Sequence, residues 1–132
     1  PQIEIKTSEA REILPKEVLL KDAISQWANV GSLIHALHTS DYKLIHRSLQ
    51  DIIVERYRKQ LIPYFDEVKF TAIEAGALGC AISGSGPSIF ALSKGKGDAE
   101  KVERAMQSVY SKTNIEYNTF VSSINTKGIK IL

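Results

Sequence analysis

The chain has 132 residues, of which 43% are hydrophobic and 24% are charged, a balance typical of one compact globular domain. Its single cysteine, Cys80, excludes an internal disulfide and favours a reducing, cytoplasmic environment. The 17 Lys and Arg residues nearly balance the 15 Asp and Glu residues, and no apolar run approaches the roughly 18 residues that a membrane span needs. We therefore expect neither a nucleic-acid partner nor a membrane-spanning helix.

The first half of the chain combines one short strand with several helices. Residues 3–5 alternate apolar and polar side chains, which predicts a half-buried strand, and a short helical segment follows at 9–14. A long helix is predicted at about 21–38, and further helices at 41–53 and 64–75. The long helix has one continuous apolar face, which we expect to help build the core. That face consists of Leu20, Ala23, Trp27, Val30, Ile34 and Leu37.

The second half of the chain is predicted to form strands and one helix. Strands are predicted at 80–82 and 88–92 around a compact turn, a helix at 98–110, and two closing strands at 117–124 and 128–132. The connections between neighbouring strands are as short as those of hairpins. Short connections favour an antiparallel sheet with helices on one side, which is an α+β fold.

The turn Ser83-Gly84-Ser85-Gly86-Pro87 is the clearest candidate for chemistry, but three familiar interpretations fail on spacing. Residues 79–85 lack the lysine of a Walker phosphate loop, and Ser85 lacks the flanking glycines of a nucleophile elbow. Ile89 stands where a dinucleotide fingerprint needs its third glycine. A tight hairpin whose two glycines have positive φ is the interpretation that these residues alone support best.

Polar side chains outside this turn give weaker signals. Four of them form an uncharged face on the long helix, which indicates a surface that something else covers, or else an ordinary mixed surface. His35 and His38 lie at i, i+3 without a third ligand, so we expect no metal site. Cys80 has no cationic neighbours in sequence and is expected to be an inert buried thiol. The uncharged face consists of Ser25, Gln26, Asn29 and Ser32.

Three segments of the chain resemble the homoserine-kinase branch of the GHMP small-molecule kinase family. Its third conserved motif is similar to residues 82–92, Ile-Ser-Gly-Ser-Gly-Pro-Ser-Ile-Phe-Ala-Leu, together with the preceding Gly76-Ala77-Leu78-Gly79. The opening of its C-terminal half is similar to residues 1–15, and its substrate-side Glu-Pro-Tyr-Arg stretch to residues 51–63, with Glu55-Arg56-Tyr57-Arg58. The resemblance is collinear and covers essentially the whole chain.

The resemblance implies transfer of the ATP γ-phosphoryl group to the side-chain hydroxyl of L-homoserine, giving O-phospho-L-homoserine on the route to threonine. It also implies that residues 1–132 form a GHMP kinase C-terminal domain, a ferredoxin-like α+β fold in which a four-stranded antiparallel sheet packs against helices. In that family an N-terminal domain with a glycine-rich phosphate loop mainly holds ATP and Mg²⁺. No such loop occurs in this sequence, which begins at Pro1 rather than Met.

The partners that the resemblance implies are L-homoserine, the chain's own N-terminal domain, which is absent here, and a second copy in a homodimer. The expected location is the cytoplasm. Because the phosphate loop lies elsewhere, we expect the isolated chain to be inactive.

The family's residue roles carry over where positions match. Arg58 corresponds to the arginine that contacts the α-carboxylate of the amino acid, a role that suits a planar guanidinium. Gln26 and Asn29 align with polar positions that face the substrate cleft. The family's turn against the phosphate loop corresponds to Ser83, Gly84, Ser85, Gly86, Pro87 and Ser88. No catalytic residue and no metal ligand carries over to this chain.

Two departures from the family pattern leave part of the site open. Arg56 replaces the proline of the Glu-Pro-Tyr-Arg stretch, and Ser122-Ser123 stands where many relatives have an arginine, so a second carboxylate contact is not assigned. The alternatives are a stand-alone α+β module for ligand sensing or interaction, or a GHMP kinase that acts on another small alcohol.

Overall fold

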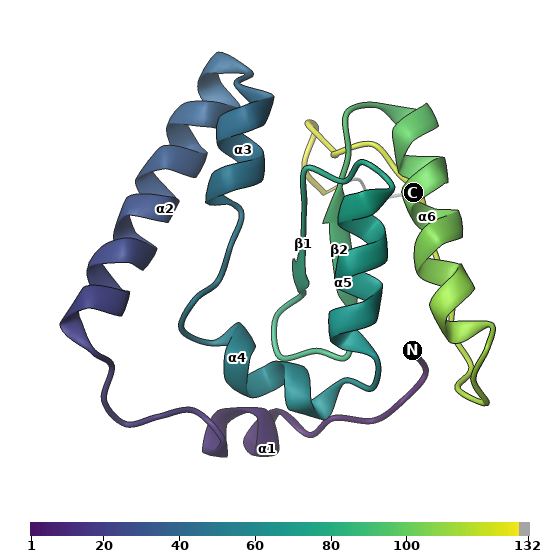
Figure 1. Ribbon diagram of the computed structural model, residues 1–132, viewed down its shortest axis with the longest axis horizontal. Coiled ribbons are helices and arrows are strands. Elements are labelled where there is room, and N and C mark those ends of the chain that lie inside the picture. The colour runs from purple at the N-terminus through teal and green to yellow at the C-terminus, as the bar shows by residue number, and fades with distance from the viewer. Residues whose placement is uncertain (130–132) are drawn as a thin grey trace.

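The computed structural model describes residues 1–129, which form two groups of elements (Figure 1). One group is the helix pair α2 and α3, the other contains both strands with α5 and α6, and α1 and α4 lie along one end of the molecule. In chain order the elements are α1 (Thr7–Glu12), α2 (Leu20–Thr39), α3 (Tyr42–Ser48), α4 (Glu55–Arg58), the 3-10 turn η1 (Lys59–Leu61), α5 (Phe65–Glu74), β1 (Gly79–Ile82), β2 (Ile89–Leu92) and α6 (Lys96–Tyr110).

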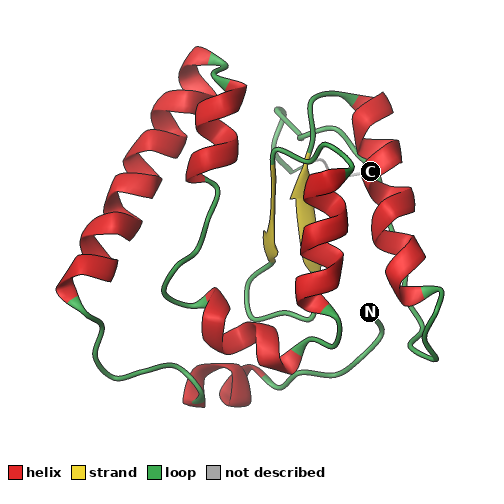
Figure 2. Ribbon diagram, in the orientation of Figure 1, coloured by secondary structure: helices red, strands yellow, loops and turns green. Residues whose placement is uncertain are grey.

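The two strands and the helices α5 and α6 make a two-layer α+β unit. β1 and β2 pair antiparallel, with residues 79–82 opposite residues 89–92. α5 and α6 pack against each other and cover one face of this hairpin (Figure 2). The core between the layers contains Ala72 from α5, Cys80 from β1 and Val102 from α6, all buried. Helices on one side of an antiparallel hairpin confirm the predicted fold class at this level.

The helices α2 and α3 form a helical hairpin that lies beside the strands. Ser40 closes α2 in the left-handed conformation, with a φ of 56°. Asp41 caps α3 as predicted, because its Oδ1 accepts a hydrogen bond of 3.0 Å from the N–H of Leu44. The predicted helix over 41–53 ends early, at Ser48, and the N–H groups of Ile52 and Ile53 are bound by the side chains of Gln26 and Asp51 instead of by helical carbonyls.

The apolar face of α2 does not belong to the core, and this corrects an expectation from the sequence. Leu20 is 68% exposed, Trp27 is 65% exposed and Ile34 is 63% exposed. α2 packs on α3 through another side, where Ala36 is buried. Periodicity shows that a helix has an apolar face but does not show what covers that face. No helix within residues 1–129 is long and apolar enough to cross a membrane.

The part of the chain that the structure describes has two strands, fewer than the four of the predicted sheet. Residues 3–5 and 117–124 were expected to be strands but carry no strand hydrogen bonding, although the N–H of Gln2 donates to the carbonyl of Glu116 at 2.6 Å. The strand predicted at 128–132 lies largely outside the described residues. Alternating burial persists at 115–121, but alternation describes one strand's two faces and does not supply the partner that a ladder needs.

The glycine turn between β1 and β2 has the predicted backbone conformation. Gly84 has a φ of +61° and Gly86 a φ of +86°, both in the region that favours glycine. The N–H of Ser83 donates to the carbonyl of Ser88 at 2.8 Å, and the N–H of Gly86 donates to the carbonyl of Ser83 at 3.1 Å. An added Cβ at Gly86 would lie 3.0 Å from Cδ1 of Ile62, whereas one at Gly84 would meet nothing within 4 Å.

Replacing Gly86 by Ala should lower the free energy of unfolding by about 1–2 kcal/mol, because a side chain at positive φ is strained and Ile62 must also move. The matched control is Gly31→Ala in the middle of α2, where an added Cβ meets nothing within 4 Å. That control should be stabilising by up to about 1 kcal/mol, as expected for alanine in a helix interior. Urea titrations of the three proteins measure both effects, and equal shifts of the same sign would contradict the prediction.

Cys80 should make the protein less stable at alkaline pH. Burial raises the pKa of its thiol from 9.0 to about 12, so the folded state holds this proton more tightly than the unfolded state. The stabilisation is complete below pH 9 and is lost as the pH rises through about 12. Unfolding free energies measured from neutral to alkaline pH should fall less steeply for Cys80→Ala than for the unchanged protein, and identical slopes would contradict this origin.

Candidate functional site

A cavity of about 250 Å³ lies between the α2–α3 hairpin and the β1–β2 hairpin. Its wall comes from α2, the segment before α4, α4 itself, both strands and the glycine turn. It brings together three residues that the sequence singled out, Gln26, Arg58 and Gly84. Asn29 and the turn residues other than Gly84 are not in its wall. The cavity is therefore the place where the sequence-predicted residues converge, although only some of them reach it.

α4 is a single turn whose start is fixed by side chains from outside the helix. Oδ1 of Asp51 accepts hydrogen bonds from the N–H groups of Ile53 at 2.9 Å and Val54 at 2.7 Å. Oε1 of Gln26 accepts from the N–H of Ile52 at 3.0 Å, and its Nε2 donates to the carbonyl of Gln50 at 3.4 Å. Gln26 therefore holds the backbone in front of α4 and uses its amide for that purpose.

Arg58 projects from α4 and is held by two carbonyl groups. Its Nε donates to the carbonyl of Ala10 at 3.1 Å, and its Nη1 donates to the carbonyl of Gly84 at 2.8 Å. These bonds join α4 to α1 and to the glycine turn. A guanidinium has five N–H donors in a plane, so donors remain for another acceptor. Arg58 is thus a half-buried cation with a fixed position in the cavity wall.

Nearby cations differ from Arg58, because each has a carboxylate partner. Arg56 pairs with Asp22 at 2.8 Å, and this hydrogen bond raises the pKa of Arg56. Lys59 pairs with Asp66 at 2.7 Å, and Lys69 pairs with Glu55. Among residues 1–129, no carboxylate forms a salt bridge with Arg58. The positive charge of Arg58 is therefore available to an anion that enters the cavity.

Glu55 is a cavity residue to which the sequence analysis assigned no role. Its Oε1 accepts a hydrogen bond from Nζ of Lys69, which reaches it from α5, and its Oε2 is buried without a partner in the described part of the chain. The two residues are 14 positions apart, so no helical spacing connects them in the sequence. Only the tertiary structure reveals this pair.

Asn29, a predicted substrate-binding residue, and the pair Ser122-Ser123, which stands where many relatives have an arginine, lie outside the cavity wall. Asn29 is half-buried on α2, and Ser122 and Ser123 are exposed near the end of the described chain. Among residues 1–129, the cavity wall contains no arginine other than Arg58, so it offers no second guanidinium for a carboxylate. Within residues 1–129, no three His, Cys, Asp or Glu side chains are grouped closely enough to hold a metal ion.

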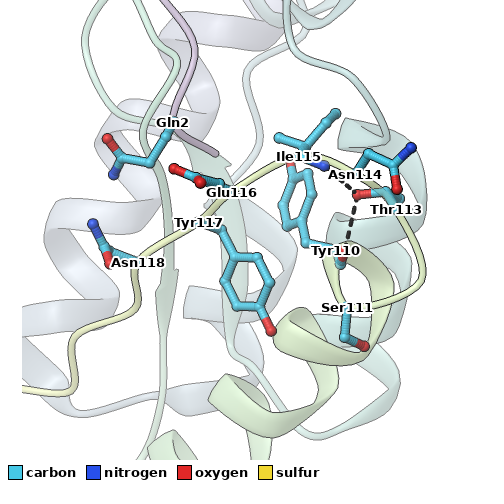
Figure 3. Close-up of a pocket in the computed structure, with 9 residues that line it drawn as sticks. All are labelled: Gln2, Tyr110, Ser111, Thr113, Asn114, Ile115, Glu116, Tyr117 and Asn118. Atoms are coloured by element: carbon cyan, nitrogen blue, oxygen red, sulfur yellow. Dashed lines mark hydrogen bonds between the residues drawn. The ribbon is translucent and has the colours of Figure 1, made fainter.

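A second hollow lies near the N-terminus, between Gln2 and the segment 110–118 (Figure 3). The hydroxyl of Tyr110 donates to the carbonyl of Pro63 at 2.9 Å, and burial raises the pKa of this phenol to about 12. Thr113 is hydrogen-bonded to the backbone of Tyr110 and of Ile115. None of the sequence-predicted site residues lines this hollow, and it is wide and open to solvent.

Comparisons with known proteins agree with the resemblance. Residues 33–112 match the family described as GHMP kinases C terminal. A homoserine kinase from Chlorobium phaeobacteroides (strain BS1) is 48% identical over 134 residues, which cover 100% of this chain and 42% of that protein. A homoserine kinase from Pyrococcus furiosus is 40% identical over 98% of this chain and 43% of its own length.

A solved structure has the same fold. The crystal structure of homoserine kinase from Cytophaga hutchinsonii superposes with a TM-score of 0.94 at 51% identity, and covers 97% of this chain and 41% of that chain. This chain therefore spans about two fifths of the length of the relatives that it matches. Because the family match extends over more than half of its residues, the chain belongs to the C-terminal domain family of the GHMP kinases.

Proposed function

We propose that this chain is the substrate-side, C-terminal domain of a homoserine kinase, which transfers the γ-phosphoryl group of ATP to the hydroxyl of L-homoserine and forms O-phospho-L-homoserine. The observation that carries the proposal is Arg58, a cation that has no carboxylate partner among residues 1–129 and lies in the wall of a small cavity. The names of the relatives supply the substrate, since proteins 48% and 51% identical to this chain are called homoserine kinases.

Arg58 is proposed to bind the α-carboxylate of homoserine. A planar guanidinium binds a carboxylate through parallel hydrogen bonds, and such charge-assisted bonds are stronger than neutral ones. The carbonyls of Ala10 and Gly84 already fix the guanidinium, so binding orders few additional degrees of freedom. The consequence is orientation of the acceptor, which is the main contribution that a protein makes to phosphoryl transfer.

The glycine turn is proposed to lie against the phosphate loop of the N-terminal domain. Open space around the Cα of Gly84 leaves room for the backbone of another domain, and the carbonyl of Gly84 is bound to Arg58. The turn and the carboxylate site are then mechanically connected through one side chain. Gln26 is proposed to position this arrangement. Asn29 lies on α2 outside the cavity wall, so it is proposed to face the substrate only in the complete two-domain cleft.

ATP and Mg²⁺ are proposed to be held by an N-terminal domain that accounts for the remaining length of the relatives. The described residues lack the carboxylate cluster that Mg²⁺ prefers, so this chain does not fit the metal by itself. In such a kinase the N-terminal domain holds the nucleotide and the C-terminal domain holds the substrate. A homodimer and a cytoplasmic location belong to the same proposal.

The four-stranded sheet is proposed for the complete protein. Residues 115–121 alternate half-buried and exposed side chains, as a strand does, and the carbonyl of Glu116 already accepts from the N–H of Gln2. Further pairing between these two segments would supply two more strands, and the ferredoxin-like arrangement also requires that they pair with β1 or β2.

Replacing Arg58 by Ala in the full-length kinase should raise the KM for L-homoserine by about tenfold or more, because a charge-assisted contact is worth about 2 kcal/mol. Steady-state kinetics with varied L-homoserine measure the effect. Arg104→Ala is the control, since Arg104 is an exposed cation on α6 outside the cavity. An unchanged KM in a folded Arg58→Ala protein would remove Arg58 from the site.

The isolated chain should not release ADP when it is mixed with Mg²⁺, ATP and L-homoserine, because it lacks a phosphate-binding loop. A full-length homoserine kinase under the same conditions is the positive control. Turnover above background would show that one domain is sufficient.

Parallel assays of the full-length kinase with mevalonate or a sugar test whether the protein is a GHMP kinase for another small alcohol. A kcat/KM on either compound higher than that on L-homoserine would assign another alcohol as the substrate.

A further inference from the structure

α4 places a negative and a positive side chain one helical turn apart in the same cavity wall. Glu55 and Arg58 are at i, i+3, a spacing at which opposite charges on a helix are neighbours and attract each other. The structure nevertheless contains no ion pair between them. Glu55 is bound to Lys69, and Arg58 is bound to the carbonyls of Ala10 and Gly84. Each of the two charges is therefore held by a partner outside α4.

The Glu55–Lys69 pair is the least exposed ion pair among the described residues. The side chains of Glu55 and Lys69 are 13% and 26% exposed, against 37% and 66% for Lys59 and Asp66. Screening by water is weaker for partly buried charges, so this pair holds its geometry more firmly than a surface pair. Nζ of Lys69 also lies 5.8 Å from the ring centroid of Phe65, which restricts it further.

We propose that Lys69 is a positioning residue that holds Glu55 and thereby preserves the free positive charge of Arg58 for the substrate carboxylate. Without Lys69, the carboxylate of Glu55 would be left partly buried and unpaired, a state that costs free energy. Arg58 is the cation one turn away along α4, and pairing with it would relieve that cost. The same pairing would neutralise the group on which the proposed function rests.

A direct contact between Glu55 and the ammonium group of the substrate is a competing explanation. The unpartnered Oε2 is fully buried, so a ligand cannot reach it in this structure. A role limited to folding is the other explanation. Both alternatives predict that loss of the Glu55 carboxylate impairs the enzyme whether or not Lys69 is present. The positioning proposal predicts instead that loss of this carboxylate lowers the KM for L-homoserine when Lys69 is absent. The double variant separates these predictions.

The experiment uses the full-length kinase and compares Lys69→Met with the double variant Lys69→Met, Glu55→Gln. Lys69→Met should raise the KM for L-homoserine by about tenfold and leave kcat and the KM for ATP within about twofold, since it changes the electrostatics of one subsite. The double variant should return the KM to within about threefold of the original, because no carboxylate is left to compete. Lys59→Met is the matched control and should leave the KM unchanged.

Four results would overturn the inference, and one of them would also overturn the proposed function. A folded Lys69→Met protein with an unchanged KM, while Arg58→Ala raises it, removes Lys69 and leaves the function intact. A double variant as impaired as Lys69→Met points to a folding role. An unchanged KM for L-homoserine in Arg58→Ala shows that Arg58 does not bind the carboxylate, and this result also overturns the proposed function. If Lys69→Met does not fold, Lys69→Gln takes its place, with the same expectations for the single and the double variant. A rise of about tenfold in Glu55→Gln alone would show direct substrate contact and overturn the inference.

Discussion

The two hydrogen bonds of Arg58 are the interaction on which the proposed site depends. They connect α4, the carbonyl at Ala10 in α1 and the carbonyl at Gly84 in the turn between β1 and β2. These three elements are distant in sequence, and Arg58 is hydrogen-bonded to both of the others. One planar cation with several donors satisfies both carbonyls and keeps its charge, which no lysine could do with the same geometry.

α4 itself owes its position to charges on neighbouring elements. A single helical turn is not stable alone, because nucleation costs more than one hydrogen bond returns. Here Arg56 is bound to Asp22 on α2, Glu55 to Lys69 on α5, and Asp51 caps the N–H groups at the start of the turn. The three charged side chains of α4, Glu55, Arg56 and Arg58, thus each bind a different part of the molecule. The turn is less a helix in its own right than a junction between helices.

The sequence predicted local structure well and long-range pairing poorly. Periodicity located α2, α5 and α6, and glycine chemistry predicted the positive φ of Gly84 and Gly86, because these depend on nearby residues. The exposure of the apolar face of α2 and the pairing of Glu55 with Lys69 depend on what folds back against each element. The convergence of Gln26 and Arg58 on one cavity followed from a family resemblance, since their separation of 32 residues obeys no local rule.

The exposure of Trp27 determines which spectroscopic signal follows the unfolding of this protein. It is the single tryptophan of the chain and is 65% exposed on α2, so its indole is already in contact with water in the folded state. The packed aromatic rings are tyrosines instead: Tyr110 lies edge-on to Tyr64, with ring centroids 6.4 Å apart, and 5.8 Å from Tyr117. Loss of core packing will therefore appear in the near-ultraviolet dichroism of tyrosine, while tryptophan emission follows the surroundings of α2.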